Sequence, residues 1–155
     1  MSELRVPTVA TEAEILCADG RSFRGRVFIP GLALRHSGPM RLEEWLNDTP
    51  QFFPFLPDDA ERPVLMNKRE VLIMTFSAPP PEEDGAEPEG PHRRVAIECE
   101  ARRLEGVLVI DMPSHLSRVL DFLNRPELFL TLRDGNRHHL VQKERITRVL
   151  EVPEA

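Results

Sequence analysis

The sequence has little of several residue types on which catalytic and metal sites depend. It contains no tyrosine, one tryptophan and two cysteines among its 155 residues. The cysteines, Cys17 and Cys99, lie far apart, and neither has a second cysteine or a histidine at the spacing of a zinc site. We expect two buried thiols and no metal centre. A disulfide between the two cysteines is the less favoured alternative in a cytoplasmic protein.

Long apolar runs and targeting signals are also missing. No apolar stretch approaches the roughly 20 residues that a membrane helix needs. The N-terminus has no basic start followed by a hydrophobic segment, so it does not resemble a secretory signal. With 41% hydrophobic and 30% charged residues, the chain has the composition of a globular protein. These features predict a cytoplasmic protein without a membrane partner.

Local catalytic motifs are absent from the sequence. It has no Ser-His-Asp ordering, nucleophile elbow, phosphate loop or HExxH motif. Its histidines are scattered, and the adjacent pair His138 and His139 would point to opposite faces of a strand. We therefore expect a protein that is not an enzyme and holds no cofactor. A hydrolase site assembled across the two halves of the chain is a weaker alternative.

Negative charge is concentrated in one short segment. The formal net charge is -6. Residues 81–91 contain five acidic residues and no basic residue, among prolines and glycines. The remaining chain has nearly equal numbers of acids and bases, so it carries no electrostatic signature of a nucleic-acid binder and does not exclude one. Residues 77–92 cannot bury enough apolar surface to fold, which predicts a flexible acidic, proline-rich linker between residues 1–76 and 93–155.

The two halves resemble each other in three blocks that recur in the same order. ILCADGRSFRGRVFI aligns with AIECEARRLEGVLVI, EEWLNDTPQFFPF with LDFLNRPELFLTL, and LMNKREVLIM with LVQKERITRV. The alignment matches Cys17 to Cys99, Gly25 to Gly106, Asn47 to Asn124 and Lys68 to Lys143. Three blocks in order favour a tandem duplication.

Each half predicts the element order ββαβββ. Alternating apolar residues around Asp19-Gly20 predict a hairpin over residues 12–18 and 23–29. Short helices follow at residues 40–47 and 114–124, with Ser114 as N-cap and Asn47 and Asn124 as left-handed C-caps. Three strands then come at residues 51–56, 64–67 and 70–76, and again at 128–132, 138–142 and 145–152. We expect a mostly β protein with short helices, built as two small, strongly bent sheets or barrels that pack about a pseudo-twofold axis.

The hairpin DGRSFRGRVFI, the Leu-Asn pair and the two closing strands resemble the Sm-like fold of small β-barrels, in tandem. The resemblance covers most of each half and implies five bent strands and RNA binding at the turn before the last strand. Here those turns contain Asn67-Lys68 and Gln142-Lys143 in place of the family's Arg-Gly or Lys-Gly. The whole chain also looks similar to uncharacterised bacterial proteins.

Two sets of residues are candidates for binding. Lys68, Arg69, Lys143 and Arg145 lie at the turns where an Sm-like protein would contact RNA. Phe53 lies in the aromatic segment FFPF, where adjacent rings point to opposite faces, so that one ring must face away from its own module.

Arg24 and Arg26 share a strand face and form a third, weaker candidate. They could contact phosphate or a cyclic dinucleotide, as in PilZ domains, but the accompanying Asp/Asn-x-Ser-x-x-Gly element is missing. An exposed charged face is the simpler interpretation.

The sequence thus favours a non-enzymatic protein-interaction or assembly module with a protein partner or self-association. Single-stranded RNA or nucleotide binding in the Sm-like manner is the alternative.

Overall fold

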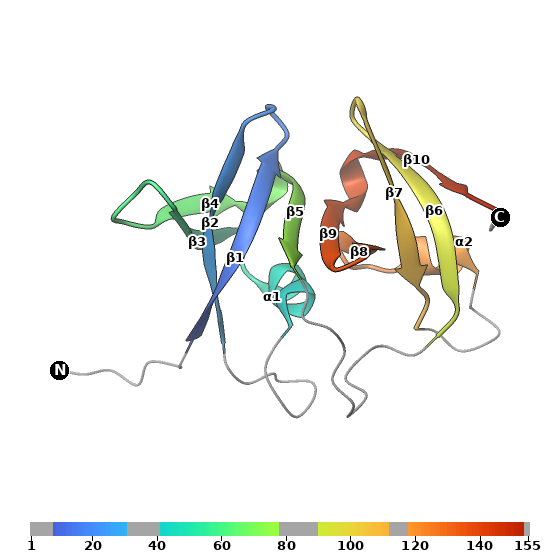
Figure 1. Cartoon of the computed structure of the whole chain (residues 1–155), viewed down its shortest axis with the longest axis horizontal. Helices are drawn as coiled ribbons and strands as arrows, with labels where there is room; N and C mark the ends of the chain where they lie inside the picture. The colour runs from blue at the N-terminus through green and yellow to red at the C-terminus, as the bar shows by residue number, and fades with distance from the viewer. Residues whose placement is uncertain (1–7, 31–40, 78–89, 112–117, 154–155) are drawn as a thin grey trace. The chain divides into compact units, whose positions relative to one another are not determined.

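A computed structural model describes residues 8–30, 41–77, 90–111 and 118–153 of the chain (Figure 1). The chain divides into two compact units, unit 1 (Met1–Met74) and unit 2 (Thr75–Ala155). The predicted linker falls mostly on residues 78–89, which lie outside the described residues.

Unit 1 begins with a long hairpin and continues through a helix into three short strands. Its elements are β1 (Thr8–Cys17), β2 (Ser22–Pro30), α1 (Leu42–Asp48), β3 (Phe52–Pro57), β4 (Val64–Asn67), the 3-10 helix η1 (Lys68–Glu70) and β5 (Val71–Ser77), whose last three residues belong to unit 2. The strand order is β5-β1-β2-β3-β4, and the β1–β2, β2–β3 and β3–β4 pairs are antiparallel.

Unit 2 repeats this element order. It contains β6 (His92–Cys99), β7 (Arg102–Val109), α2 (Val119–Leu123), β8 (Phe129–Asp134), β9 (Arg137–Gln142), the 3-10 helix η3 (Lys143–Arg145) and β10 (Ile146–Glu151). The strand order is β10-β6-β7-β8-β9, which matches that of unit 1 strand for strand. The prediction of a mostly β protein with short helices is confirmed. The strand order is open, however, so the strands do not form a closed barrel.

The predicted hairpin is present, and its turn has a clear chemical basis. Asp19 accepts a hydrogen bond from the backbone N–H of Arg21 at 3.0 Å, and Gly20 adopts a φ of 91°, which glycine tolerates best. The corresponding turn of unit 2 is one residue shorter and lacks glycine. Glu100 takes the left-handed conformation there, with a φ of 57°.

Two glycines that the sequence alignment matches serve the same purpose in the two units. A Cβ atom on Gly25 would lie 2.1 Å from the carbonyl oxygen of Leu56, and one on Gly106 would lie 2.5 Å from that of Arg133. Gly25 lies on β2 against β3, and Gly106 lies on β7 against β8. Each glycine therefore permits a close approach of the second strand to the third.

The helices differ from the predictions at their ends. α1 begins at Leu42, and Leu42, Trp45 and Leu46 form its buried face, with the Trp45 ring meeting Phe53 edge-on at 5.3 Å. In the described part of unit 2 the helix is Val119–Leu123, and the predicted N-cap Ser114 lies outside the described residues.

The expectation of left-handed asparagine caps is wrong. Asn47 lies inside α1, and Asn124 caps α2 with a φ of -88°. Both side-chain amides donate to the carbonyl four residues earlier, Asn47 to Glu43 and Asn124 to Leu120, each at 3.0 Å. These hydrogen bonds hold both asparagine side chains against their own helices, and neither asparagine adopts a left-handed conformation.

Candidate functional site

The predicted binding residue Lys68 is part of the architecture of unit 1. Its side chain is buried, and its Nζ donates to the carbonyl oxygens of Asn47 and Thr49, both at 2.9 Å. Burial lowers the pKa of the ammonium group, while the nearby Asp48 carboxylate opposes that shift. Lys68 thus ties the C-terminal end of α1 to η1 with hydrogen bonds to carbonyls that the helix leaves unpaired.

Lys143 has the same role in unit 2. Its Nζ donates to the carbonyl oxygen of Leu123 at 3.2 Å and also to that of Arg125. Burial again lowers the pKa of the ammonium group. The two lysines that the sequence alignment matched therefore join the end of a helix to a 3-10 turn in the same way.

The two arginines of the predicted RNA site are exposed. The backbone N–H of Arg69 donates to the Asn67 side chain at 3.1 Å, and the Arg145 guanidinium lies 3.5 Å from the Glu100 carboxylate. RNA binding at these turns stays a prediction, with the arginines rather than the lysines as its exposed cations.

The arginines of the first hairpin fit the simpler interpretation. Arg24 lies opposite Glu14 on β1 and forms an ion pair with it at 2.6 Å, and both Arg24 and Arg26 are exposed. Val27, which follows Arg26 on β2, is fully buried, so β2 has one charged face and one core face.

The structure places Phe53 in the core of unit 1 and not on an outer face. Phe53 and Phe55 are fully buried, whereas the Phe52 side chain is 53% exposed. Phe53 packs edge-on against Trp45 of α1, which fixes the side of β3 that faces inward. One ring of the segment does face outward, as expected, but it is Phe52.

Strand β4 forms an open edge in unit 1. Among the described residues, its only hydrogen-bonded neighbour is β3, with Leu65 opposite Pro54 and Asn67 opposite Phe52. The backbone N–H of Lys68 donates to the carbonyl of Gln51 at 2.7 Å.

This register fixes the direction in which the backbone of β4 presents its polar groups. The hydrogen bond from Lys68 to Gln51 shows that these two residues form a hydrogen-bonded pair. Residue pairs in an antiparallel ladder alternate between hydrogen-bonded and non-hydrogen-bonded types, so Leu65 and Pro54, three pairs away, form a non-hydrogen-bonded pair. Pro54 has no N–H to offer, which fits that pair type. The N–H and C=O groups of Leu65 and Asn67 therefore point away from β3 toward the open edge.

The same edge carries an apolar outer face. Leu65 is 72% exposed and Phe52 is 53% exposed, and Pro54 between them on this face is also exposed. We call Phe52, Pro54 and Leu65 the β4 face. Val64, on the other side of β4, is 42% exposed. The strand has no charged side chain, and this combination is typical of a surface to which another strand adds.

Strand β10, which begins the strand order of unit 2, has a different character from β4. Arg148 on β10 forms an ion pair with Glu98 of the neighbouring β6, and Thr147 and Glu151 are exposed. Charged side chains on an edge strand oppose the addition of a further strand. Of β4 and β10, only β4 has the properties of a docking edge.

Leu65 and the β4 edge were not predicted from the sequence. The signal was a four-residue strand without a charged side chain. Alternation of side chains along β3 predicts that one ring faces outward, but it does not show which of the two faces is the outer one.

The histidines and cysteines show no clustering in the part of the chain that the structure describes. There, no group of three or more His, Cys, Asp or Glu side chains is arranged to hold a metal ion. Both cysteines are buried free thiols, and burial raises their pKa values, for Cys99 to about 11. A raised pKa keeps these thiols protonated and unreactive at neutral pH.

His139 predicts a pH dependence of stability in unit 2. Its Nδ1 lies 2.8 Å from the hydroxyl oxygen of Thr75, and burial, followed by the nearby Arg137, lowers its pKa. The native state therefore favours neutral His139, and the contribution is complete above the unfolded pKa near 6.5 and declines as the pH falls below it. Between pH 7.5 and pH 5, the free energy of unfolding should fall less in His139→Asn than in the wild type. Denaturant titration at the two pH values measures this difference. An equal loss in both proteins would contradict this.

No helix of the described residues is long and apolar enough to cross a membrane. In comparisons with known proteins, no family model, curated protein or solved structure matches the chain.

Proposed function

We propose that the chain is a non-enzymatic protein-interaction or assembly module whose docking surface is the open edge of β4 with the β4 face beside it. The observation that carries this proposal is the exposure of the Leu65 side chain and backbone at this edge. Its side chain is 72% exposed on an uncharged strand, and the register of β4 turns its backbone N–H and C=O toward the same open edge. A protein strand supplies both the hydrogen bonds and the apolar contacts that such an edge lacks.

The chemistry of this edge favours a protein over a nucleic acid. Nucleic acids bind mainly through phosphate contacts to cations, and β4 has none. The Nζ groups of Lys68 and Lys143 donate to backbone carbonyls of their own units. Single-stranded RNA binding would depend on Arg69 and Arg145 and is the competing outcome.

The proposal also treats the two units as duplicated, Sm-like modules. Three features support this. The units share a strand order, matched lysines lie at their helix ends, and matched glycines lie where the second and third strands approach closely. A module that has been duplicated and keeps one uncharged edge strand is suited to assembly.

Affinity capture with matched variants tests the proposal. The wild type, Leu65→Lys and Val9→Lys would each be immobilised and exposed to lysate from source cells, with and without nuclease. Val9 is a suitable control because it is an exposed apolar residue, 54% accessible, on a strand with neighbours. We expect the wild type and Val9→Lys to retain a protein that Leu65→Lys loses.

Two results would count against the proposal. One is an identical set of captured proteins for all three chains. The other is retention that depends on RNA and is lost in Arg69→Glu with Arg145→Glu, which would favour the RNA-binding alternative.

A further inference from the structure

The β4 edge is compatible with a symmetric pairing. An antiparallel pair of identical strands can be related by a two-fold axis perpendicular to the sheet, and such an axis sets a residue opposite its own counterpart. Leu65 is the residue near the middle of β4 whose N–H and C=O both point to the open edge. An axis beside Leu65 would let two copies exchange two hydrogen bonds between their Leu65 backbones.

The neighbouring residues suit the same register. It sets Pro63 of one copy opposite Asn67 of the other. The Asn67 N–H then donates to the Pro63 carbonyl. Proline has no N–H of its own, so no donor at this position lacks an acceptor.

The axis also keeps the outer faces on one side of the joined sheet. Phe52, Pro54 and Leu65 of the two copies would therefore form one continuous apolar surface. Leu65, the most exposed large apolar side chain among the described residues, would become buried against its own counterpart.

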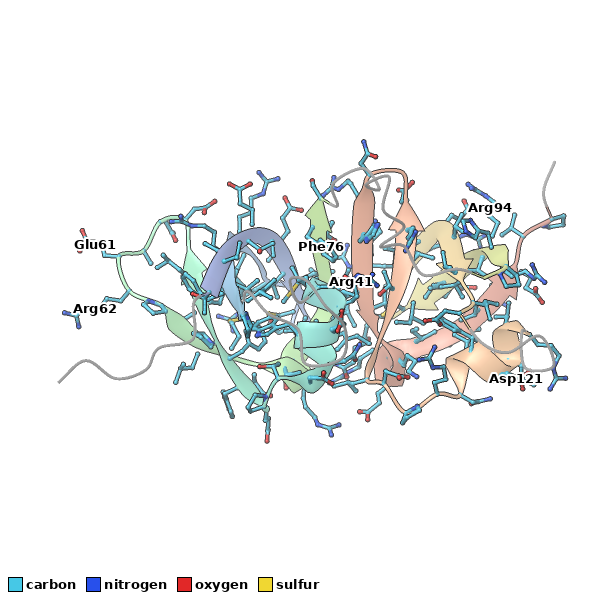
Figure 2. The ribbon with its side chains drawn as sticks, turned by 90° about the horizontal axis from the view of Figure 1, so that it is seen from below. Arg41, Glu61, Arg62, Phe76, Arg94 and Asp121 are labelled. Atoms are coloured by element: carbon cyan, nitrogen blue, oxygen red, sulfur yellow. The ribbon has the colours of Figure 1, made fainter. Side chains whose placement is uncertain are left out.

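Charge at the two ends of β4 favours the antiparallel arrangement. The turn before β4 contains Asp58, Asp59 and Glu61 with Arg62, and Figure 2 shows Glu61 and Arg62 extending from this turn. The residue after Lys68 is the exposed Arg69. Antiparallel pairing brings the acidic turn of each copy toward Arg69 of the other, whereas parallel pairing would bring like charges together.

From this geometry we infer that two copies of the chain associate through β4, with the two-fold axis passing between their two Leu65 residues. This inference rests on the proposed function, because it names the partner of the same edge. It differs from a head-to-tail chain of copies, in which β4 would pair with β10. The ion-paired Arg148 and the exposed Glu151 on β10 disfavour that arrangement.

Sedimentation velocity of the full chain, from micromolar to submillimolar concentration, tests the inference. We expect a monomer–dimer equilibrium for the wild type and for the controls Val9→Lys and Thr147→Lys, the latter at an exposed position of β10. Leu65→Lys sets two ammonium groups opposite each other and should raise the dimer Kd at least about tenfold. Thermal unfolding of each variant would verify that it is folded.

Cross-linking identifies the symmetry. A short bismaleimide should join two copies of Leu65→Cys but not two copies of Val9→Cys. The native thiols of Cys17 and Cys99 are buried, with raised pKa values, and should not react.

Several outcomes would overturn the inference. A wild type that stays monomeric at all concentrations would do so, as would open-ended oligomers that Thr147→Lys disrupts. Failure here leaves the proposed function standing as long as Leu65→Lys still loses a captured protein that the wild type retains.

Discussion

Exchanging Phe53 for aspartate is expected to unfold unit 1, whereas the same exchange at Phe52 is expected to leave it folded. Phe53 is fully buried against Trp45, so the exchange removes a core ring and buries a carboxylate without a partner. Such a change costs about 4 kcal/mol or more. Phe52 is 53% exposed, and its replacement should change the free energy of unfolding by less than about 1 kcal/mol.

Circular dichroism with tryptophan fluorescence measures this contrast, because Trp45 is the single tryptophan and reports on unit 1. Loss of the cooperative fluorescence transition in Phe53→Asp alone is the expected result. Equal stability of the two variants would mean that β3 presents the opposite face to the core.

Replacing Lys68 or Lys143 with methionine is expected to destabilise the corresponding unit by about 2–3 kcal/mol. Methionine keeps the apolar stem but removes the ammonium donor, so two carbonyls at the end of α1 or α2 lose their hydrogen bonds. Arg69→Met provides a matched control, because its exposed side chain lies on the same 3-10 turn. Its expected effect is below about 0.5 kcal/mol.

Urea titration with fluorescence for unit 1 and circular dichroism for the whole chain would measure these losses. If Lys68→Met and Arg69→Met were equally mild, the helix-end role of Lys68 would be incorrect. Charge reversal at the two lysines is a poor test of RNA binding because it would place a carboxylate against backbone carbonyls. Reversal at Arg69 and Arg145 tests it without that complication.

The course of the chain was predictable from the sequence because the relevant signals are local. The Asp19-Gly20 turn and the alternation around it specify the first hairpin, and β4 was predicted at its observed bounds. The alignment of the two halves also identified residues with matching structural roles. Gly25 and Gly106 permit close strand approach, and Lys68 and Lys143 bind the ends of their helices.

The roles of the matched lysines were not predictable in the same way. A lysine at a turn has a long side chain that either extends into solvent or folds back onto a carbonyl, and the sequence does not contain the distance between η1 and α1. The choice between Phe52 and Phe53 depended on where Trp45 packs, which is a tertiary contact. The left-handed caps were wrong because residue type alone does not show where a helix ends or which backbone conformation ends it. α1 continues past Asn47 to Asp48, and Asn124 ends α2 with a negative φ.

The direction of the β4 backbone is likewise a property of pairing rather than of composition. It follows from the register with β3 and from one backbone hydrogen bond, that of Lys68 to Gln51. The proposed docking edge therefore required the structure.

Amide hydrogen exchange of the full chain at low and high protein concentration, resolved residue by residue by NMR, tests the central claim most directly. The amides of Leu65 and Asn67 point to the open edge, so they should exchange rapidly at low concentration and become protected as the chain associates. The amides of Val64 and Met66 should be protected at both concentrations. Unchanged exchange at Leu65, with new protection on β10 or elsewhere, would contradict an interaction surface at β4.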